Sequence, residues 1–149
     1  MNIQSKISIL ALVSALAFGA HAAQAKSIEV NVSVAKFETT GAKLMVALFS
    51  NKQSYKSDNR LRGRILEPQA GTASVVFSDL PVGEYAIKLF YDVNANGKLD
   101  TNLLGIPSEP FGFSNDAPVS FGPAKWDAAK FKLTDNQVRQ NIHLFKMGQ

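Results

Sequence analysis

The feature that most constrains this fold is a two-residue alternation of apolar and polar side chains in short segments separated by turn residues. Between Ser27 and Phe37, apolar residues at positions 28, 30, 32 and 34 alternate with polar ones. Successive side chains of a strand point to opposite faces, so this period predicts a strand with one buried face. Beyond residue 25, no segment of ten or more residues has a convincing helical period. The chain is therefore expected to be all-β.

Five further segments predict strands: 43–49, 72–77, 84–91, 129–133 and 138–145. Segment 43–49 is apolar on both faces, which indicates a central strand. The turn residues at 39–41 predict a hairpin between the first strand and 43–49. A turn with Pro81 and Gly83 predicts a second pair, 72–77 with 84–91, and residues 134–136 separate the last two strands. Short helical turns are expected within 51–59 and 126–130.

Six or seven short strands with turns between them predict an antiparallel β-sandwich of immunoglobulin-like or prealbumin-like type. A small closed barrel is the alternative. Between Asp92 and Lys130 the sequence predicts no strand, yet residues 90–131 hold seven of the fourteen aromatic residues. Disordered segments are poor in aromatics, so one long ordered loop is expected. Phe111, Phe113 and Trp126 are expected either to form a second hydrophobic cluster or to line a ligand groove.

Residues 1–25 predict a signal peptide, followed by a single domain at 26–149. The segment has a polar start with Lys6, an apolar run at 7–20, and the small-x-small sequence Ala23-Gln24-Ala25. The run is shorter than the roughly 20 residues of a transmembrane helix, so the mature form would have no transmembrane segment. No cysteine follows it, which excludes a lipid-anchored lipoprotein. The expected location is the periplasm, with secretion as the alternative.

The chain has no cysteine and two histidines, one of them, His21, within the expected signal peptide. This composition excludes cysteine nucleophiles, thiolate zinc sites and sites that need several imidazoles. No G-x-S-x-G or similar nucleophile motif is present. A non-catalytic function is therefore expected. A hydrolase that uses two carboxylates among Glu109, Asp116 and Asp127 is the less favoured alternative.

The sequence DVNANGKLD at 92–100 places oxygen-bearing side chains at loop positions 1, 3, 5 and 9, with Gly97 at position 6. This spacing is typical of calcium loops, in which alternate residues of a tight turn point toward one cation. The expected ligands are side-chain oxygens and one backbone carbonyl, supplied by Asp92, Asn94, Asn96, Lys98 and Asp100.

Position 12 of such a loop carries a bidentate glutamate, but here it is Leu103. Calcium affinity is therefore expected to be weak, in the range of about 10⁻⁴ to 10⁻³ M. Glu109 or Asp116 could supply the missing ligand by folding back. The alternative is a metal-free loop in which Asp and Asn side chains bond to their own backbone.

Positive charge is concentrated between residues 51 and 64, although the net charge of the whole chain is only +4. If Arg60, Arg62 and Arg64 lie on an edge strand, their side chains share one face of it. Such charges block edge-to-edge pairing, or they bind an anionic surface such as lipopolysaccharide phosphate, acidic glycan or phospholipid head groups. Aromatic residues are not interleaved with them, so no nucleic-acid partner is expected. The basic residues are Lys52, Lys56, Arg60, Arg62 and Arg64.

Three segments together resemble the bacterial domain-of-unknown-function family 2141: 77–87, 92–115 and 121–123. The resemblance implies an exported all-β domain, and the family has no assigned reaction. The 92–100 loop is also similar to the calcium-holding loops of B-type repeats in Gram-positive surface adhesins. Residues 79–85 are similar to a turn-and-strand motif of prealbumin-like sandwich domains, which bears on architecture and not on catalysis.

These observations predict an exported, non-catalytic binding or structural module of the bacterial cell envelope, with calcium stabilising the 92–100 loop. Its partner would be an envelope protein, a glycan or an anionic lipid surface. The alternative is a periplasmic carrier that holds a small molecule in the aromatic groove.

Overall fold

The computed structural model describes residues 26–37, 39–120 and 122–148. The expected signal peptide, residues 1–25, lies outside the described residues. Within the described ranges, none of the helices is long and apolar enough to cross a membrane.

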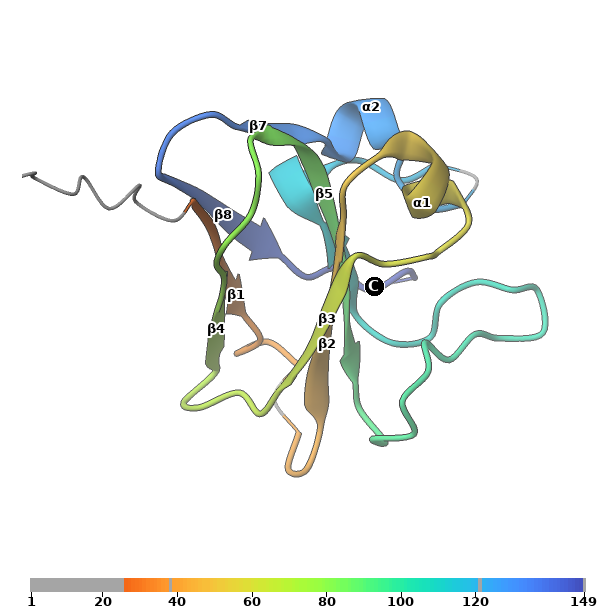
Figure 1. Ribbon diagram of the computed structural model, residues 1–149. Coiled ribbons are helices and arrows are strands. Elements are labelled where there is room, and N and C mark those ends of the chain that lie inside the picture. Colours follow the sequence, from red (N-terminus) through yellow and green to blue (C-terminus); the bar gives the residue numbers. More distant parts are fainter. Residues whose placement is uncertain (1–25, 38, 121, 149) are drawn as a thin grey trace, which may run out of the picture.

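The described chain forms two sheets with short helical segments beside them (Figure 1). The first sheet has the order β4-β1-β8, and its strands are β1 (Ser27–Ser33), β4 (Thr72–Phe77) and β8 (Gln137–His143). The second has the order β3-β2-β5-β6, with β7 also paired to β5. Its strands are β2 (Lys43–Phe49), β3 (Arg62–Leu66), β5 (Gly83–Asp92), β6 (Phe111–Phe113) and β7 (Phe131–Leu133). The helical segments are α1 (Lys52–Lys56), η1 (Ser114–Asp116) and α2 (Trp126–Ala129).

One hydrophobic core lies between the two sheets, because alternate residues of each strand point into it. The alternation predicted for β1 is confirmed, since Ile28, Val30 and Val32 are all buried. From the second sheet, β2 and β5 contribute Leu44, Val46, Leu48, Ile87, Leu89 and Tyr91. The mostly β class is confirmed, and two open sheets around a shared core are consistent with a sandwich.

The two predicted strand pairs, β1 with β2 and β4 with β5, are wrong, because each connection leads from one sheet to the other. β1 and β2, β4 and β5, and β7 and β8 all lie in different sheets. β1 pairs instead with β4 in antiparallel and with β8 in parallel orientation, so the first sheet is mixed rather than antiparallel. A turn signal shows where the chain reverses, but it does not show which edge the next strand joins.

A second hydrophobic cluster lies on the outer face of the second sheet, under α1 and α2. Tyr55 of α1 packs edge-to-face on Phe49 and on Trp126 of α2, with ring centroids 5.4 and 5.6 Å apart. The Lys88 ammonium lies 4.4 Å from the Tyr55 ring centroid and donates to the Tyr55 carbonyl. The helical turns expected within 51–59 and 126–130 are thus confirmed, and they cover this face of the sheet.

β6 lies in the stretch where the sequence predicts no strand. It is only three residues long and pairs with β5. A side chain at its central residue, Gly112, would come within 2.9 Å of the His143 carbonyl oxygen. Glycine therefore lets the end of β8 pass close to β6, and Phe111 and Phe145 exchange two backbone hydrogen bonds there.

Candidate functional site

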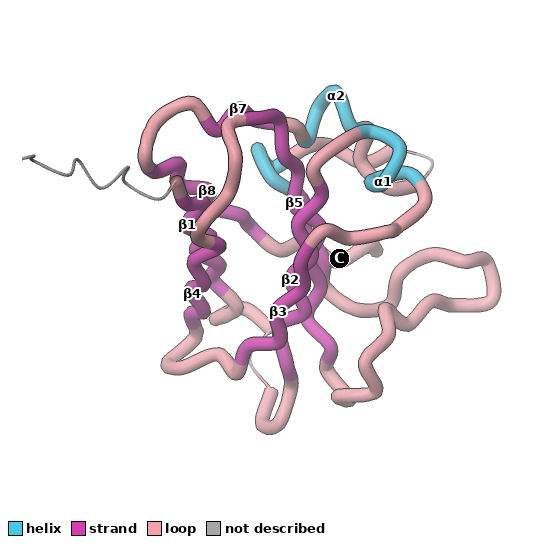
Figure 2. The backbone as a smooth tube through the Cα atoms, in the orientation of Figure 1, coloured by secondary structure: helices cyan, strands magenta, loops and turns pink. Residues whose placement is uncertain are grey.

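The most distinctive surface feature is the loop between β5 and β6, residues 93–110, which we call the projecting loop. Figures 1 and 2 show it leaving the body of the molecule toward the right of the view. It begins at Asp92, which ends β5 and is only 1% exposed. The Asp92 carboxylate accepts the backbone N–H groups of Asn96, at 3.0 Å, and Gly97, at 2.7 Å. Gly97 has a φ of +80°, a conformation that favours glycine at this bend.

Glu109 holds the two ends of the loop together. Its carboxylate is buried and accepts the Val93 N–H at 2.7 Å and the Asp100 N–H at 3.0 Å. A buried carboxylate is stable where it accepts hydrogen bonds, so this residue satisfies backbone groups on both sides of the loop. The sequence suggests Glu109 only as a substitute calcium ligand. Beyond the presence of an acidic residue, the sequence does not indicate this role, because the two hydrogen-bonding partners lie 9 and 16 residues away.

Of the five predicted calcium ligands, the side chains of Asp92, Asn94, Asn96 and Asp100 come together, in an arrangement closed by hydrogen bonds. The Asn94 and Asn96 side-chain amides donate to the Asp100 carboxylate, at 2.7 Å for Asn94 and 3.0 Å for the nearer Asn96 bond. The Asn96 side-chain oxygen accepts the Lys98 N–H at 2.8 Å. Among the described residues, no three His, Cys, Asp or Glu side chains form a group that could hold a metal ion. The arrangement resembles the metal-free alternative, with side chains bonded to nearby backbone.

The tip of the projecting loop, residues 101–107, exposes apolar side chains on a hydrogen-bonded turn. The Asn102 side-chain oxygen accepts the backbone N–H groups of Leu104 and Ile106. The Asn102 N–H donates to the Ile106 carbonyl at 2.9 Å. Leu103 is 106% exposed and Leu104 is 84% exposed. The residue that departs from the calcium-loop pattern is therefore the most exposed of these apolar residues.

Of the three alternating arginines, Arg62 and Arg64 lie on the edge strand β3, and Arg60 precedes it. Arg62 and Arg64 pair in register with the core-facing residues Leu48 and Val46, so they point to the inner side of β3. Arg62 donates to the Ser78 carbonyl at 2.5 Å, and the Arg64 guanidinium lies 5.5 Å from the Phe77 ring centroid. Both side chains therefore reach from the edge of the second sheet to β4, at the edge of the first.

The other basic residues are not gathered into one site. Lys52 forms an exposed ion pair with Asp127 at 2.8 Å, which joins α1 to α2. The hydrogen bond from Lys52 lowers the pKa of Asp127. Lys56 and Arg60 are exposed, and Arg60 precedes β3. The five basic residues therefore divide between the α1 region and the β3 edge.

The aromatic residues proposed to line a groove belong to the second hydrophobic cluster. Phe111, Phe113 and Trp126 are each 6% exposed and pack against neighbours of that cluster. Burial of all three rings favours the cluster interpretation over the groove interpretation.

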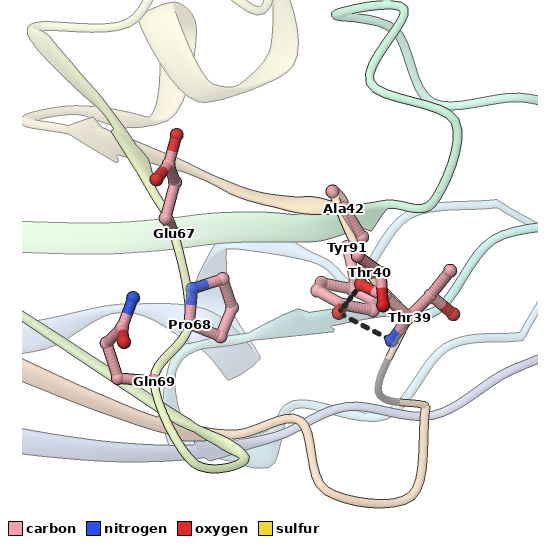
Figure 3. A pocket seen from close by; sticks show the side chains of 8 residues that line it. Thr39, Thr40, Ala42, Glu67, Pro68, Gln69 and Tyr91 are labelled. Carbon is pink, nitrogen blue, oxygen red and sulfur yellow. Dashed lines mark hydrogen bonds between the residues drawn. The ribbon is translucent and has the colours of Figure 1, made fainter.

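A separate cleft of about 430 Å³ lies beside the 39–41 turn. Figure 3 shows the Tyr91 hydroxyl directed at Thr39, while Glu67 points away from both. The hydroxyl accepts the Thr39 N–H at 3.2 Å and donates to the Thr39 carbonyl at 3.3 Å. The single hydroxyl proton is therefore used within the protein.

Asp116 forms a contact that the sequence does not predict. Its carboxylate lies 2.7 Å from Nδ1 of His143 and accepts the His143 backbone N–H at 2.8 Å. Both side chains are exposed. The pair attaches η1 to the end of β8, so Asp116 does not fold toward the projecting loop.

Comparison with known proteins adds family membership. A model of the family described as "Uncharacterized protein conserved in bacteria (DUF2141)" matches residues 32–141. No curated protein and no solved structure matches the chain.

Proposed function

We propose that this chain, which belongs to DUF2141, a family of uncharacterized bacterial proteins, is an exported, non-catalytic binding module of the cell envelope. The observation that carries this proposal is the projecting loop, which holds Leu103 and Leu104 in water on an internally hydrogen-bonded turn. Single exposed leucines are normal on protein surfaces, whereas adjacent leucines that are both almost fully exposed form an apolar group of the kind that marks interaction sites. Ile106, in the same tip, is 37% exposed.

The buried carboxylates support a binding role for this loop. Asp92 and Glu109 together accept four backbone N–H groups, so the loop has a defined shape before any partner arrives. A pre-formed binding surface loses less conformational entropy on association than a flexible one. The loop therefore presents its apolar tip at low entropic cost.

Sedimentation with isolated bacterial envelopes tests the function. The mature protein is expected to sediment with the envelopes, and the double variant Leu103→Ser/Leu104→Ser is expected to remain in solution. The matched control is Leu61→Ser/Ile65→Ser, which removes two apolar side chains that are 49% and 62% exposed elsewhere on the surface. Failure of the wild-type protein to sediment, or equal loss in both variants, would contradict the proposed function.

Export is part of the same proposal and rests on residues 1–25. Signal peptidase is expected to cleave after Ala25, so the periplasmic form would begin at Lys26. N-terminal sequencing of protein released from the periplasm checks this. An uncleaved N-terminus on the released protein would contradict it.

We also retain weak calcium binding as a proposal for the 92–100 loop. The support is the position of the oxygen-bearing side chains: Asp92 and Asn94 both accept the Asn96 N–H, and the Asp100 carboxylate lies next to the side-chain amides of Asn94 and Asn96. A cation would take the place of the two asparagine amide donors that face Asp100. Excess calcium is then expected to raise the melting temperature relative to chelator, because a ligand that binds the folded state stabilises it. Identical melting temperatures in calcium and chelator would refute the proposal.

For the architecture, we propose a sandwich of immunoglobulin-like or prealbumin-like type. Its support is that β1–β2, β4–β5 and β7–β8 each connect the two sheets, as in Greek-key sandwiches. A crystal structure in which the first and second sheets closed into a continuous barrel would contradict this type.

A further inference from the structure

We propose that the tip of the projecting loop, residues 101–107, inserts Leu103 and Leu104 into the interfacial region of a phospholipid bilayer. This inference rests on the proposed function, because it names the envelope component that the loop would bind. Four properties of the loop support a bilayer as the occupant: its uncharged tip, its backbone hydrogen bonds, the exposure of its two leucines and a basic residue close to the tip.

The tip carries no charge that insertion would have to desolvate. Between Asp100 and Glu109 the sequence is TNLLGIPS, which contains no Asp, Glu, Lys or Arg. Both flanking carboxylates lie at the base of the loop, where Glu109 is buried and Asp100 bonds to the two asparagine amides. Moving a charge into an apolar medium is costly, so an uncharged tip can enter one where a charged tip could not.

Most backbone N–H groups of the tip have acceptors within it. The N–H groups of Asn102, Leu104, Gly105 and Ile106 donate to oxygens of the tip, and three of these four bonds go to oxygens of Asn102. Pro107 has no backbone N–H. Backbone donors that already have partners lose little free energy when water is removed, so the turn can lie at the interface while its leucine side chains enter the apolar region.

The two leucines suit a continuous apolar medium better than a single protein pocket. Leu103 and Leu104 are adjacent in a turn, and both side chains are almost completely exposed. A pocket on a partner protein would have to be shaped to hold both side chains at once. A bilayer interface accepts both without such a shape requirement, and interfacial binding increases with the apolar area that is buried.

The projecting loop carries a basic residue close to its uncharged tip. Lys98 is exposed and lies three residues before Thr101 in the sequence. A basic residue near an anionic lipid surface adds electrostatic attraction to apolar insertion.

The experiment uses phospholipid vesicles and a single labelled position. The chain has no cysteine, so Leu103→Cys gives one site for an environment-sensitive fluorophore, and Ile65→Cys gives the matched control on the exposed edge strand. Vesicles of phosphatidylethanolamine and phosphatidylglycerol are expected to shift the emission of the label at position 103 to shorter wavelength. The label at position 65 is expected to keep its aqueous emission.

Vesicle sedimentation of unlabelled protein provides the second readout. The Leu103→Ser/Leu104→Ser variant is expected to partition into vesicles at least about tenfold less than wild type, while Leu61→Ser/Ile65→Ser partitions like wild type. An aqueous emission at position 103 on vesicles that do bind the protein would overturn insertion, because binding would then be electrostatic only. Leucine-dependent binding to envelopes without binding to vesicles would overturn the lipid partner and leave the proposed function standing. Absence of binding to both would contradict both proposals.

Discussion

At the scale of single residues, two buried carboxylates determine the shape of the projecting loop. Asp92 and Glu109 each accept two backbone N–H groups, and neither forms an ion pair among the described residues. Backbone donors that lose an acceptor cost free energy where water does not replace it fully. The shape of the loop therefore depends more on these two side chains than on the local backbone preferences of the loop residues.

The substitution Glu109→Ala tests this dependence. It leaves the N–H groups of Val93 and Asp100 without their acceptor, so the free energy of unfolding is expected to fall by about 2–4 kcal/mol. Urea unfolding measures the change. The control is Glu67→Ala, whose exposed side chain forms only a surface pair with Lys43 and is expected to cost less than about 1 kcal/mol. Equal losses in the two variants would show that Glu109 does not hold the loop.

Tyr55 predicts a loss of stability at alkaline pH. Burial raises the pKa of Tyr55, and its hydroxyl donates to the Ala124 carbonyl at 2.9 Å. In the unfolded chain the tyrosine ionises near pH 10. Above that pH the unfolded state has fewer bound protons than the folded state, so stability falls as pH rises. The Tyr55→Phe variant is expected to be less stable at neutral pH and to lose less stability between pH 9 and pH 11, measured by urea unfolding. A slope equal to that of wild type would contradict this.

Local side-chain roles could be predicted from the sequence, and distant ones could not. The DVNANG spacing predicts that Asp92, Asn94 and Asn96 converge, because a tight turn of a few residues determines their positions. The contacts of Glu109 with Val93, and of Asp116 with His143, join residues 16 and 27 positions apart. Such contacts depend on where the strands are placed, which the turn signals do not reveal.

At the scale of secondary-structure elements, the short helices α1 and α2 cover aromatic residues that the sequence alone leaves open to two interpretations. Trp126 is the chain's one tryptophan and is 6% exposed in α2. Its native fluorescence is therefore expected to resist quenching by acrylamide and to become quenchable in urea. Strong quenching in the native protein would contradict the packing of α2 and restore the groove interpretation.

Removing the inward-pointing arginines of the edge strand β3 is expected to make the protein associate with itself. Arg62 and Arg64 point inward from this edge and reach across to β4, and inward-pointing charges discourage pairing of edge strands. The Arg62→Ala/Arg64→Ala variant is expected to associate at concentrations where wild type does not, as measured by analytical ultracentrifugation. Lys56→Ala/Arg60→Ala removes the same charge outside the strand and is expected to sediment like wild type. If both variants associate, the loss of net charge is the cause, and the inward position of Arg62 and Arg64 is not.

Element positions could be predicted better than element partners. The alternation gives the position and buried face of β1, because both depend only on local side-chain order. It does not give the parallel pairing of β1 with β8, which joins segments more than a hundred residues apart. The three-residue β6 escapes prediction because Phe-Gly-Phe is too short to show a period.

At the scale of the whole molecule, the two sheets form the body from which the projecting loop extends. β5 runs from its pairing with β7 to its pairings with β2 and β6, and it ends at Asp92, where the loop begins. Phe111 after the loop pairs with Phe145, near the C-terminus. Both ends of the loop are therefore attached to ordered strands, so the body fixes the direction in which the leucines project.

Amide hydrogen exchange of the isolated mature protein measures whether the projecting loop is ordered before it meets a partner. Slow exchange is expected at Val93, Asn96, Gly97 and Asp100, whose N–H groups donate to the buried carboxylates. The Glu109→Ala variant is expected to exchange faster at Val93 and Asp100. Exchange at the rates of an unstructured chain at all four positions in the wild-type protein would show that the loop has no fixed shape of its own.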